Sequence, residues 1–146
     1  MNISDEIQHV LDVSRFAVMA TQHQGQPHAS LMAFAPMDGH RYLIVATYRA
    51  TLKYTSLSKD GRVALLIDNR NATDSAAHRG LVITAHGNAS EVPADDRAAV
   101  MRTYLARHPD FGTFLASADC ALLRVAVKAY EVVGSTDDVL WYDLEY

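Results

Sequence analysis

The chain has 146 residues, of which 49% are hydrophobic and 21% charged, and these values are typical of one soluble globular domain, residues 1–146, with a single core. No apolar run approaches the roughly 20 residues that span a bilayer, so we expect no membrane insertion. The formal net charge of −4 comes without runs of Lys or Arg, which argues against a nucleic-acid partner and requires that any bound anion be held locally.

The N-terminal residues predict a short amphipathic helix over 3–13, because apolar side chains recur there at helical spacing and Ser4 or Asp5 can cap its start. No basic segment is followed by a continuous apolar core, so the sequence does not indicate a signal peptide and we expect a cytoplasmic protein. Two apolar runs, 15–23 and 28–37, are separated by the turn residues QGQP and predict a β-hairpin.

A second pair of strands is predicted downstream of the hairpin. After a turn at Asp38 and Gly39, residues 41–47 and 62–69 are apolar runs typical of strands, and a short helix fits between them. Residues 70–78 are small and polar, so we expect an exposed loop there.

The C-terminal half mixes strands and helices. Residues 80–92 predict a long strand in which Gly87 indicates a bulge or a close backbone approach. The period becomes helical over 93–117, which predicts a helix followed by a short second one, and strands over 120–133 and 139–146 flank a Gly–Ser turn. Six or seven strands without βαβ alternation predict a mainly β fold, an antiparallel barrel or sandwich rather than a doubly wound sheet.

The cysteine and histidine residues do not indicate a disulfide or a metal site. A lone Cys120 cannot form an internal disulfide, and its setting DCALLRV indicates a small buried apolar side chain. The seven histidines never form HxH or HExxH, so we expect surface or polar-network roles and no metal site.

One stretch, ATYRATLKYTSL at 46–57, places hydroxyls and cations at every second position: Thr47, Arg49, Thr51 and Lys53. If Thr51 caps a helix beginning at LKYTSL, the free amides of that helix face the end of the preceding strand and attract an anion. Arg49 grips a phosphate through two nitrogens and Lys53 acts as a point charge. The alternative is a plain helix cap with two solvated cations, and taken alone the stretch fits that alternative better.

The order of elements resembles the FMN-binding split barrels related to pyridoxamine 5′-phosphate oxidase. The resemblance covers nearly the whole chain and depends on the leading helix and on the segments AVMATQHQGQPHASLMAF, YLIVATYRATLKYTSL with GRVALLIDN, LVITAHGNASEV, YLARHPDFGTF and ALLRVAVKAYEVV. It implies an antiparallel Greek-key split β-barrel of the FMN-binding type. It also implies that Arg49, Thr51 and Lys53 hold the FMN phosphate, with Thr47 near the ribityl chain or the phosphate.

The resemblance further implies how the flavin ring is held. The second strand, here Ser30, Leu31, Met32 and Ala33, would run beneath the ring, although Leu31 and Met32 equally suit a barrel core. The cofactor of such proteins lies between two identical subunits, so a homodimer is expected. Trp141 of the second subunit would close the site, or else serve as an ordinary dimer or core aromatic.

The implied function is that of an FMN-dependent oxidoreductase acting on an unknown small substrate, since the flavin itself carries hydride chemistry and no catalytic side chain stands out. The chain ends without the arginine-rich extension of the oxidase, and Leu52 replaces a basic residue of its phosphate stretch, so oxidation of pyridoxamine phosphate is not expected. The alternatives are a non-catalytic flavin, haem or deazaflavin carrier, and a barrel that has lost its cofactor.

Overall fold

The computed structural model describes residues 2–70, 80–134 and 138–145. Its helices are α1 (Ile3–Val13), α2 (Leu52–Lys59), α3 (Ala94–Arg107), the 3₁₀ turn η1 (Pro109–Phe111) and α4 (Gly112–Ala116). Its strands are β1 (Phe16–His23), β2 (Gln26–Ala33), β3 (Ala35–Met37), β4 (Tyr42–Tyr48), β5 (Arg62–Asp68), β6 (Val82–Glu91), β7 (Cys120–Val133) and β8 (Val139–Asp143). Within these ranges, no helix combines the length and apolar character needed to cross a bilayer.

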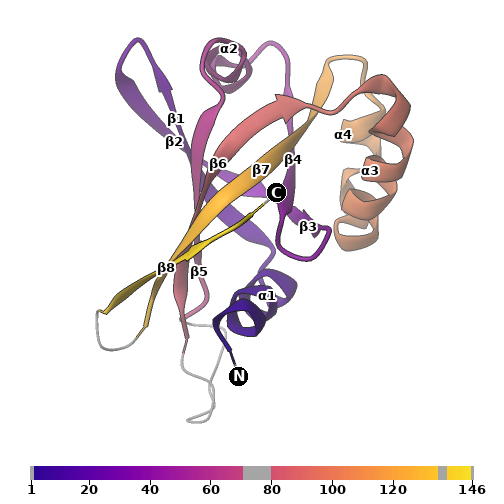
Figure 1. The fold of residues 1–146 in the computed structure, drawn as a ribbon. Helices are drawn as coiled ribbons and strands as arrows, with labels where there is room; N and C mark the ends of the chain where they lie inside the picture. The colour runs from indigo at the N-terminus through magenta and orange to yellow at the C-terminus, as the bar shows by residue number, and fades with distance from the viewer. Residues whose placement is uncertain (1, 71–79, 135–137, 146) are drawn as a thin grey trace.

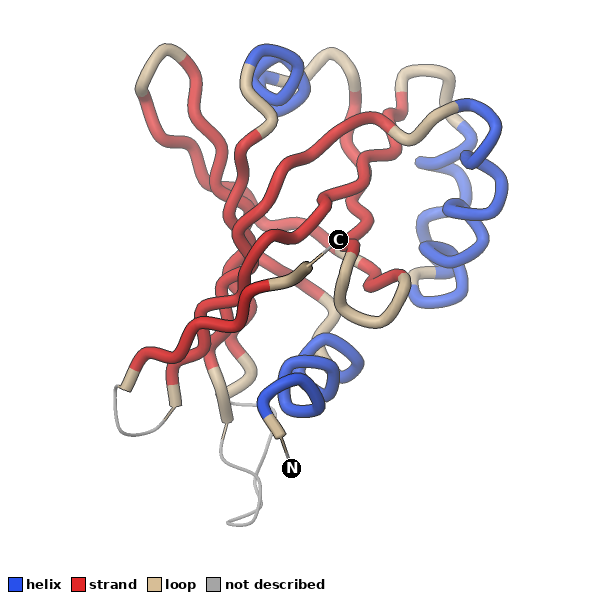
Figure 2. Tube along the Cα trace, in the orientation of Figure 1, coloured by secondary structure: helices blue, strands red, loops and turns tan. Residues whose placement is uncertain are grey.

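The strands form one antiparallel sheet in the order β2-β1-β5-β6-β7-β4-β3, with β8 added to β7. The sheet curls into an open half-barrel, and α3 and α4 lie together on one side of it (Figures 1 and 2). This architecture confirms the predicted mainly β split barrel and excludes the doubly wound alternative.

Most predicted elements are confirmed to within two residues, and α1 and β7 have the expected bounds. The turns are also confirmed, since Gly25 and Gly39 adopt φ values of 81° and 68°. At Gly87 the β6–β7 register shifts, and a Cβ there would collide with the carbonyl of Ala126, so the expected bulge is present. The predicted loop at 70–78 falls almost entirely outside the described residues, as does part of the turn at 134–135.

One strand prediction is wrong. The expected single strand over 28–37 is two strands, because β2 pairs with β1 whereas β3 pairs with β4. The change of partner occurs at Phe34, whose side chain is fully buried and whose amide donates to the carbonyl of Arg15. Both strands keep the same extended period, so the sequence pattern does not mark the break.

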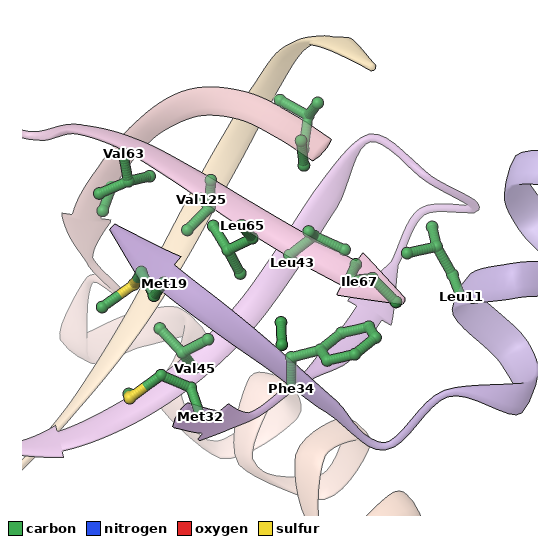
Figure 3. Packing of buried hydrophobic residues seen from close by; sticks show 14 of the residues in the cluster. Leu11, Met19, Met32, Phe34, Leu43, Val45, Val63, Leu65, Ile67 and Val125 are labelled. Carbon is green, nitrogen blue, oxygen red and sulfur yellow. The ribbon is translucent and has the colours of Figure 1, made fainter. Parts of the chain in front are cut away.

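The core lies on two sides of the sheet. The concave side holds a large apolar cluster, in which Phe34, Met32 and Val45 face Leu65 and Ile67 (Figure 3) and which α1 covers at one end (Figure 1). On the other side α3 and α4 pack over β4 and β7 and bury a second cluster, which includes Cys120 as expected. Burial of both clusters fixes the positions of β2, β4 and α2, on which the site depends.

Candidate functional site

The start of α2 is capped as the sequence predicts. The Thr51 hydroxyl accepts a hydrogen bond from the amide of Tyr54 at 3.3 Å and donates one to the carbonyl of Tyr48 at 2.8 Å. The amides of the first turn that precede Tyr54 have no acceptor within the helix and carry its partial positive charge. The end of β4 therefore meets the positive end of a helix.

Two side chains add hydrogen-bonding capacity and charge at this point. Thr47, the penultimate residue of β4, is buried, and its Oγ1 lies 3.2 Å from Oγ1 of Thr51. The Nζ atom of Lys53 lies 3.5 Å from the sulfur of Met32, a weak acceptor. No carboxylate in the described part of the chain lies within 4.0 Å of this ammonium. Within the described part of the chain, Lys53 is therefore a cation without a counter-ion.

These residues border a small hollow of about 230 Å³, which we call the Lys53 pocket. Its lining comprises Phe16, Leu31, Met32, Ala33, Ala46, Thr47, Tyr48, Lys53, Tyr104, Phe111 and Phe114. The structure thus brings together five of the residues selected from the sequence: two from the α2 stretch and three from β2. Apolar and aromatic residues dominate the wall, to which Lys53 and Thr47 add an ammonium and a hydroxyl group.

Two other residues selected from the sequence lie elsewhere. Arg49 forms an ion pair with Glu91 and donates to the Tyr54 hydroxyl at 3.3 Å, and it lines a different cavity. The hydrogen bond to Glu91 raises the pKa of Arg49 above its ordinary value. The Oγ atom of Ser30 is buried and has no hydrogen-bond partner among the residues that the structure describes, and Ser30 is not part of the pocket wall.

Trp141 belongs to β8, which lies at the other end of the molecule from α2 (Figure 1). Its ring is 5.1 Å from that of His86, and Nε2 of His86 lies 3.1 Å from Oε1 of Glu131. Trp141 does not line the Lys53 pocket of its own chain.

Strand register nevertheless connects Trp141 with the pocket. Leu31 on β2 pairs with Val18, Val18 with Leu66, and the row continues across β6 and β7 to Trp141. The apolar members of this row are 69%, 37%, 42% and 57% exposed in the order Leu31, Val18, Leu66 and Trp141. So much apolar area on one sheet face is typical of an interaction surface, and we call it the exposed row.

Sequence reasoning missed the aromatic wall of the pocket. Phe114 packs edge-on against Tyr48 with ring centroids 4.6 Å apart, and Phe111 packs against Phe114. The signal was present, because Phe111 and Phe114 are three residues apart and therefore share one face of a helical segment. Its target, the end of β4, could not be read from that spacing.

The chain is similar in sequence to proteins that are already known. A family model described as Pyridoxamine 5′-phosphate oxidase matches residues 3–134. A protein of Arabidopsis thaliana named "Non-canonical heme oxygenase HOZ, chloroplastic" is 36% identical over an alignment 139 positions long, which covers 89% of this chain and 40% of that protein. A pyridoxamine 5′-phosphate oxidase homolog of Schizosaccharomyces pombe is 33% identical over 49% of this chain and 44% of that protein. The chain therefore spans less than half the length of these curated relatives.

Solved structures show the same fold at low sequence identity. A heme binding protein from Mycobacterium smegmatis has a TM-score of 0.86 at 17% identity and covers 98% of this chain, which in turn covers 58% of that protein. A FAD-binding protein from Mesorhizobium loti has a TM-score of 0.69 at 18% identity, with 90% of this chain and 92% of that protein covered.

Proposed function

Since the chain belongs to the pyridoxamine 5′-phosphate oxidase family, we propose that it binds FMN, with the cofactor phosphate at the start of α2 and the flavin ring against β2. The proposal depends on the ammonium of Lys53, which has no counter-ion among the described residues and which lines, together with Thr47, a pocket at the N-terminal end of α2. A phosphate would supply the missing charge and accept from all three kinds of donor.

The phosphate role is divided unequally among the four residues of the stretch. Lys53 and Thr47 line the pocket, and Thr51 acts mainly through the cap that exposes the helix amides. Arg49 contributes at longer range, because Glu91 already neutralises its guanidinium. This arrangement fits one phosphate group better than a long polyanion.

The flavin ring needs more space than the pocket provides, because sites that enclose such ligands usually measure at least about 300 Å³. The ring would therefore extend from the pocket over Leu31 and the exposed row, along strand residues 30–33. A second copy of the chain packed on this face would cover the ring and the exposed apolar area together. In that homodimer, Trp141 of the partner subunit is the aromatic group that closes the site.

FMN supplies hydride-transfer chemistry when it is bound. The residues of this chain bind the phosphate, orient the ring along β2 and exclude water with the aromatic wall of Phe111 and Phe114. We infer a reductase or oxidase reaction on a small substrate that reaches the open face of the ring.

Haem is the second candidate, and the named haem proteins among the relatives favour it. Its propionates are carboxylates that suit the same ammonium and hydroxyl groups, and its flat apolar ring suits the exposed row. His86, with 39% of its side chain exposed, offers an imidazole on that face.

An absorption spectrum of the freshly purified protein, with mass analysis of the released chromophore, tests the proposal. Flavin bands and the mass of FMN are expected, together with bleaching by a reduced nicotinamide cofactor. A Soret band would identify haem, and a deazaflavin mass would identify a deazaflavin, as the cofactor of the Lys53 pocket in place of FMN. A protein that takes up no chromophore even when soaked with FMN and haem would contradict both candidates.

A further inference from the structure

We propose that a second cavity, on the α3 side of the molecule, binds a small monocarboxylate through the guanidinium of Arg97. The cavity has a volume of about 450 Å³ and is lined by Arg49, Glu91, Val92, Ala94, Arg97, Met101, Leu115, Ala116, Ser117, Ala118 and Cys120. It shares no lining residue with the Lys53 pocket. The proposal therefore goes beyond cofactor binding and does not depend on it.

Hydrogen bonds hold the guanidinium of Arg97 in place and leave some of its N–H groups unused. Its Nη2 atom donates at 3.4 Å to the carbonyls of Leu115 and Cys120, which orients the guanidinium towards the end of α4. Over the residues that the structure describes, no carboxylate lies within 4.0 Å of this half-buried group. A planar guanidinium with unused N–H groups matches the two oxygens of a carboxylate.

The charges around the cavity favour an anion of one charge. Arg49 is paired with Glu91, so these two residues cancel and Arg97 supplies the net positive charge. The Glu91 carboxylate would repel the second charge of a phosphate or a dicarboxylate more than it would a single carboxylate. The first residue of α3, Ala94, also borders the cavity, and the carboxylates of Asp95 and Asp96 in that first turn disfavour a second negative charge on the ligand.

The remaining wall suits an apolar body on the acid. Val92, Leu115 and Cys120 are buried, and Met101 is partly buried beside them. Burial raises the pKa of the Cys120 thiol, which therefore presents a neutral apolar surface rather than a thiolate. A cavity of this volume accepts an acid carrying one ring or a short branched chain.

The test uses benzoate as probe and its neutral isostere benzamide as control, with chemical shifts of the backbone amides as readout. We expect benzoate to bind in the millimolar range or tighter and to shift the amides of Met101, Leu115 and Cys120. Benzamide should bind at least tenfold more weakly. Arg97→Gln should lose benzoate binding by at least tenfold, whereas Arg102→Gln, on the same helix but outside the cavity, should retain it.

Equal binding of benzoate and benzamide would overturn the proposal, as would benzoate shifts confined to the Lys53 pocket or no shift at 20-fold molar excess over about 1 mM protein. This comparison uses the unmodified protein and does not depend on the folding of a variant. Glu91→Gln gives a further check, because it frees Arg49 and should improve binding of the dicarboxylate phthalate more than binding of benzoate. The reverse order would contradict the assigned charge balance.

Discussion

The two cations of one short stretch, Arg49 and Lys53, have opposite electrostatic surroundings. Arg49 precedes the helix cap, and its amide donates to the carbonyl of Asp119 at 2.7 Å, which directs its side chain towards Glu91 and the α3 side. Lys53 lies in the first turn of α2 and reaches back to Met32 on β2. A cation with a counter-ion is largely structural, whereas a cation without one is available to a ligand. Counter-charge, and not proximity in sequence, thus distinguishes the proposed phosphate site.

We expect the largest effect from a substitution in the exposed row, which should weaken FMN binding and leave the cavity around Arg97 unchanged. Leu66→Asp places a charge on the face that we assign to the homodimer, at a side chain 42% exposed in the protomer, so folding should persist. Burying such a charge costs about 3–5 kcal/mol, so the dimer should dissociate and FMN affinity should fall with it. Sedimentation velocity and FMN titration measure both effects.

Ala98→Asp, at an exposed position on α3, is the matched control and should change neither property. The Leu66→Asp variant should also bind benzoate in the cavity around Arg97 as tightly as the unmodified protein does. A Leu66→Asp variant that remains a dimer and keeps FMN would show that the exposed row is not the interface.

The next largest effect is expected from removal of the Lys53 ammonium. Lys53→Ala should weaken FMN by about ten- to a hundredfold, the value of one charge-assisted contact of about 1.5–3 kcal/mol. Fluorescence quenching of FMN reports the affinity. Lys59→Ala, at the other end of the same helix, should leave the FMN affinity unchanged. Equal losses of affinity in the two variants would show that net charge, and not a direct contact of Lys53, causes the effect.

A smaller effect is expected for the cap between the two cations. Thr51→Ala removes the acceptor of the Tyr54 amide and should lower the free energy of unfolding by about 1 kcal/mol. Urea denaturation measures this change. Thr55→Ala, on the exposed side of the helix, should cost less than half as much. If both variants are equally stable, the cap does not position the helix start.

The smallest effect is expected for the compensated cation. Arg49→Gln should alter FMN affinity by less than about threefold and stability by less than about 1 kcal/mol, since the side chains of the Arg49–Glu91 pair are 35% and 41% exposed. The same titration and denaturation series measure both. A loss as large as that of Lys53→Ala would mean that the pair opens and that Arg49 binds the phosphate directly.

Much of the fold follows from local sequence patterns. The spacing of Ile7, Val10 and Leu11 predicts α1, and all three side chains are buried. The alternation along β7 and the cap at Thr51 depend on near neighbours and were predicted for that reason. The bulge at Gly87 depends on a contact with β7, and it was predicted because a glycine within a strand indicates such an approach. The break at Phe34 was not, because a strand that changes partner keeps its period.

The candidate site was predicted in part. Thr47, Lys53 and the β2 residues meet because β4, α2 and β2 converge. Neither the direction of Arg49 nor the cavity around Arg97 could be read from the sequence. The first depends on Glu91 of β6 and on the carbonyl of Asp119, and the second depends on residues of α4 and β7. Glu91 is 42 residues from Arg49, and only the sheet register brings them together.

Titrations of the unmodified protein and of Lys53→Ala with FMN and with riboflavin, which has the same ring and no phosphate, test the phosphate site most directly. We predict that the unmodified protein binds FMN at least tenfold more tightly than riboflavin, and that Lys53→Ala reduces this ratio to about threefold or less while riboflavin affinity stays the same. A ratio near one in the unmodified protein, or an undiminished ratio in Lys53→Ala, would contradict the assignment of the α2 start as the phosphate site.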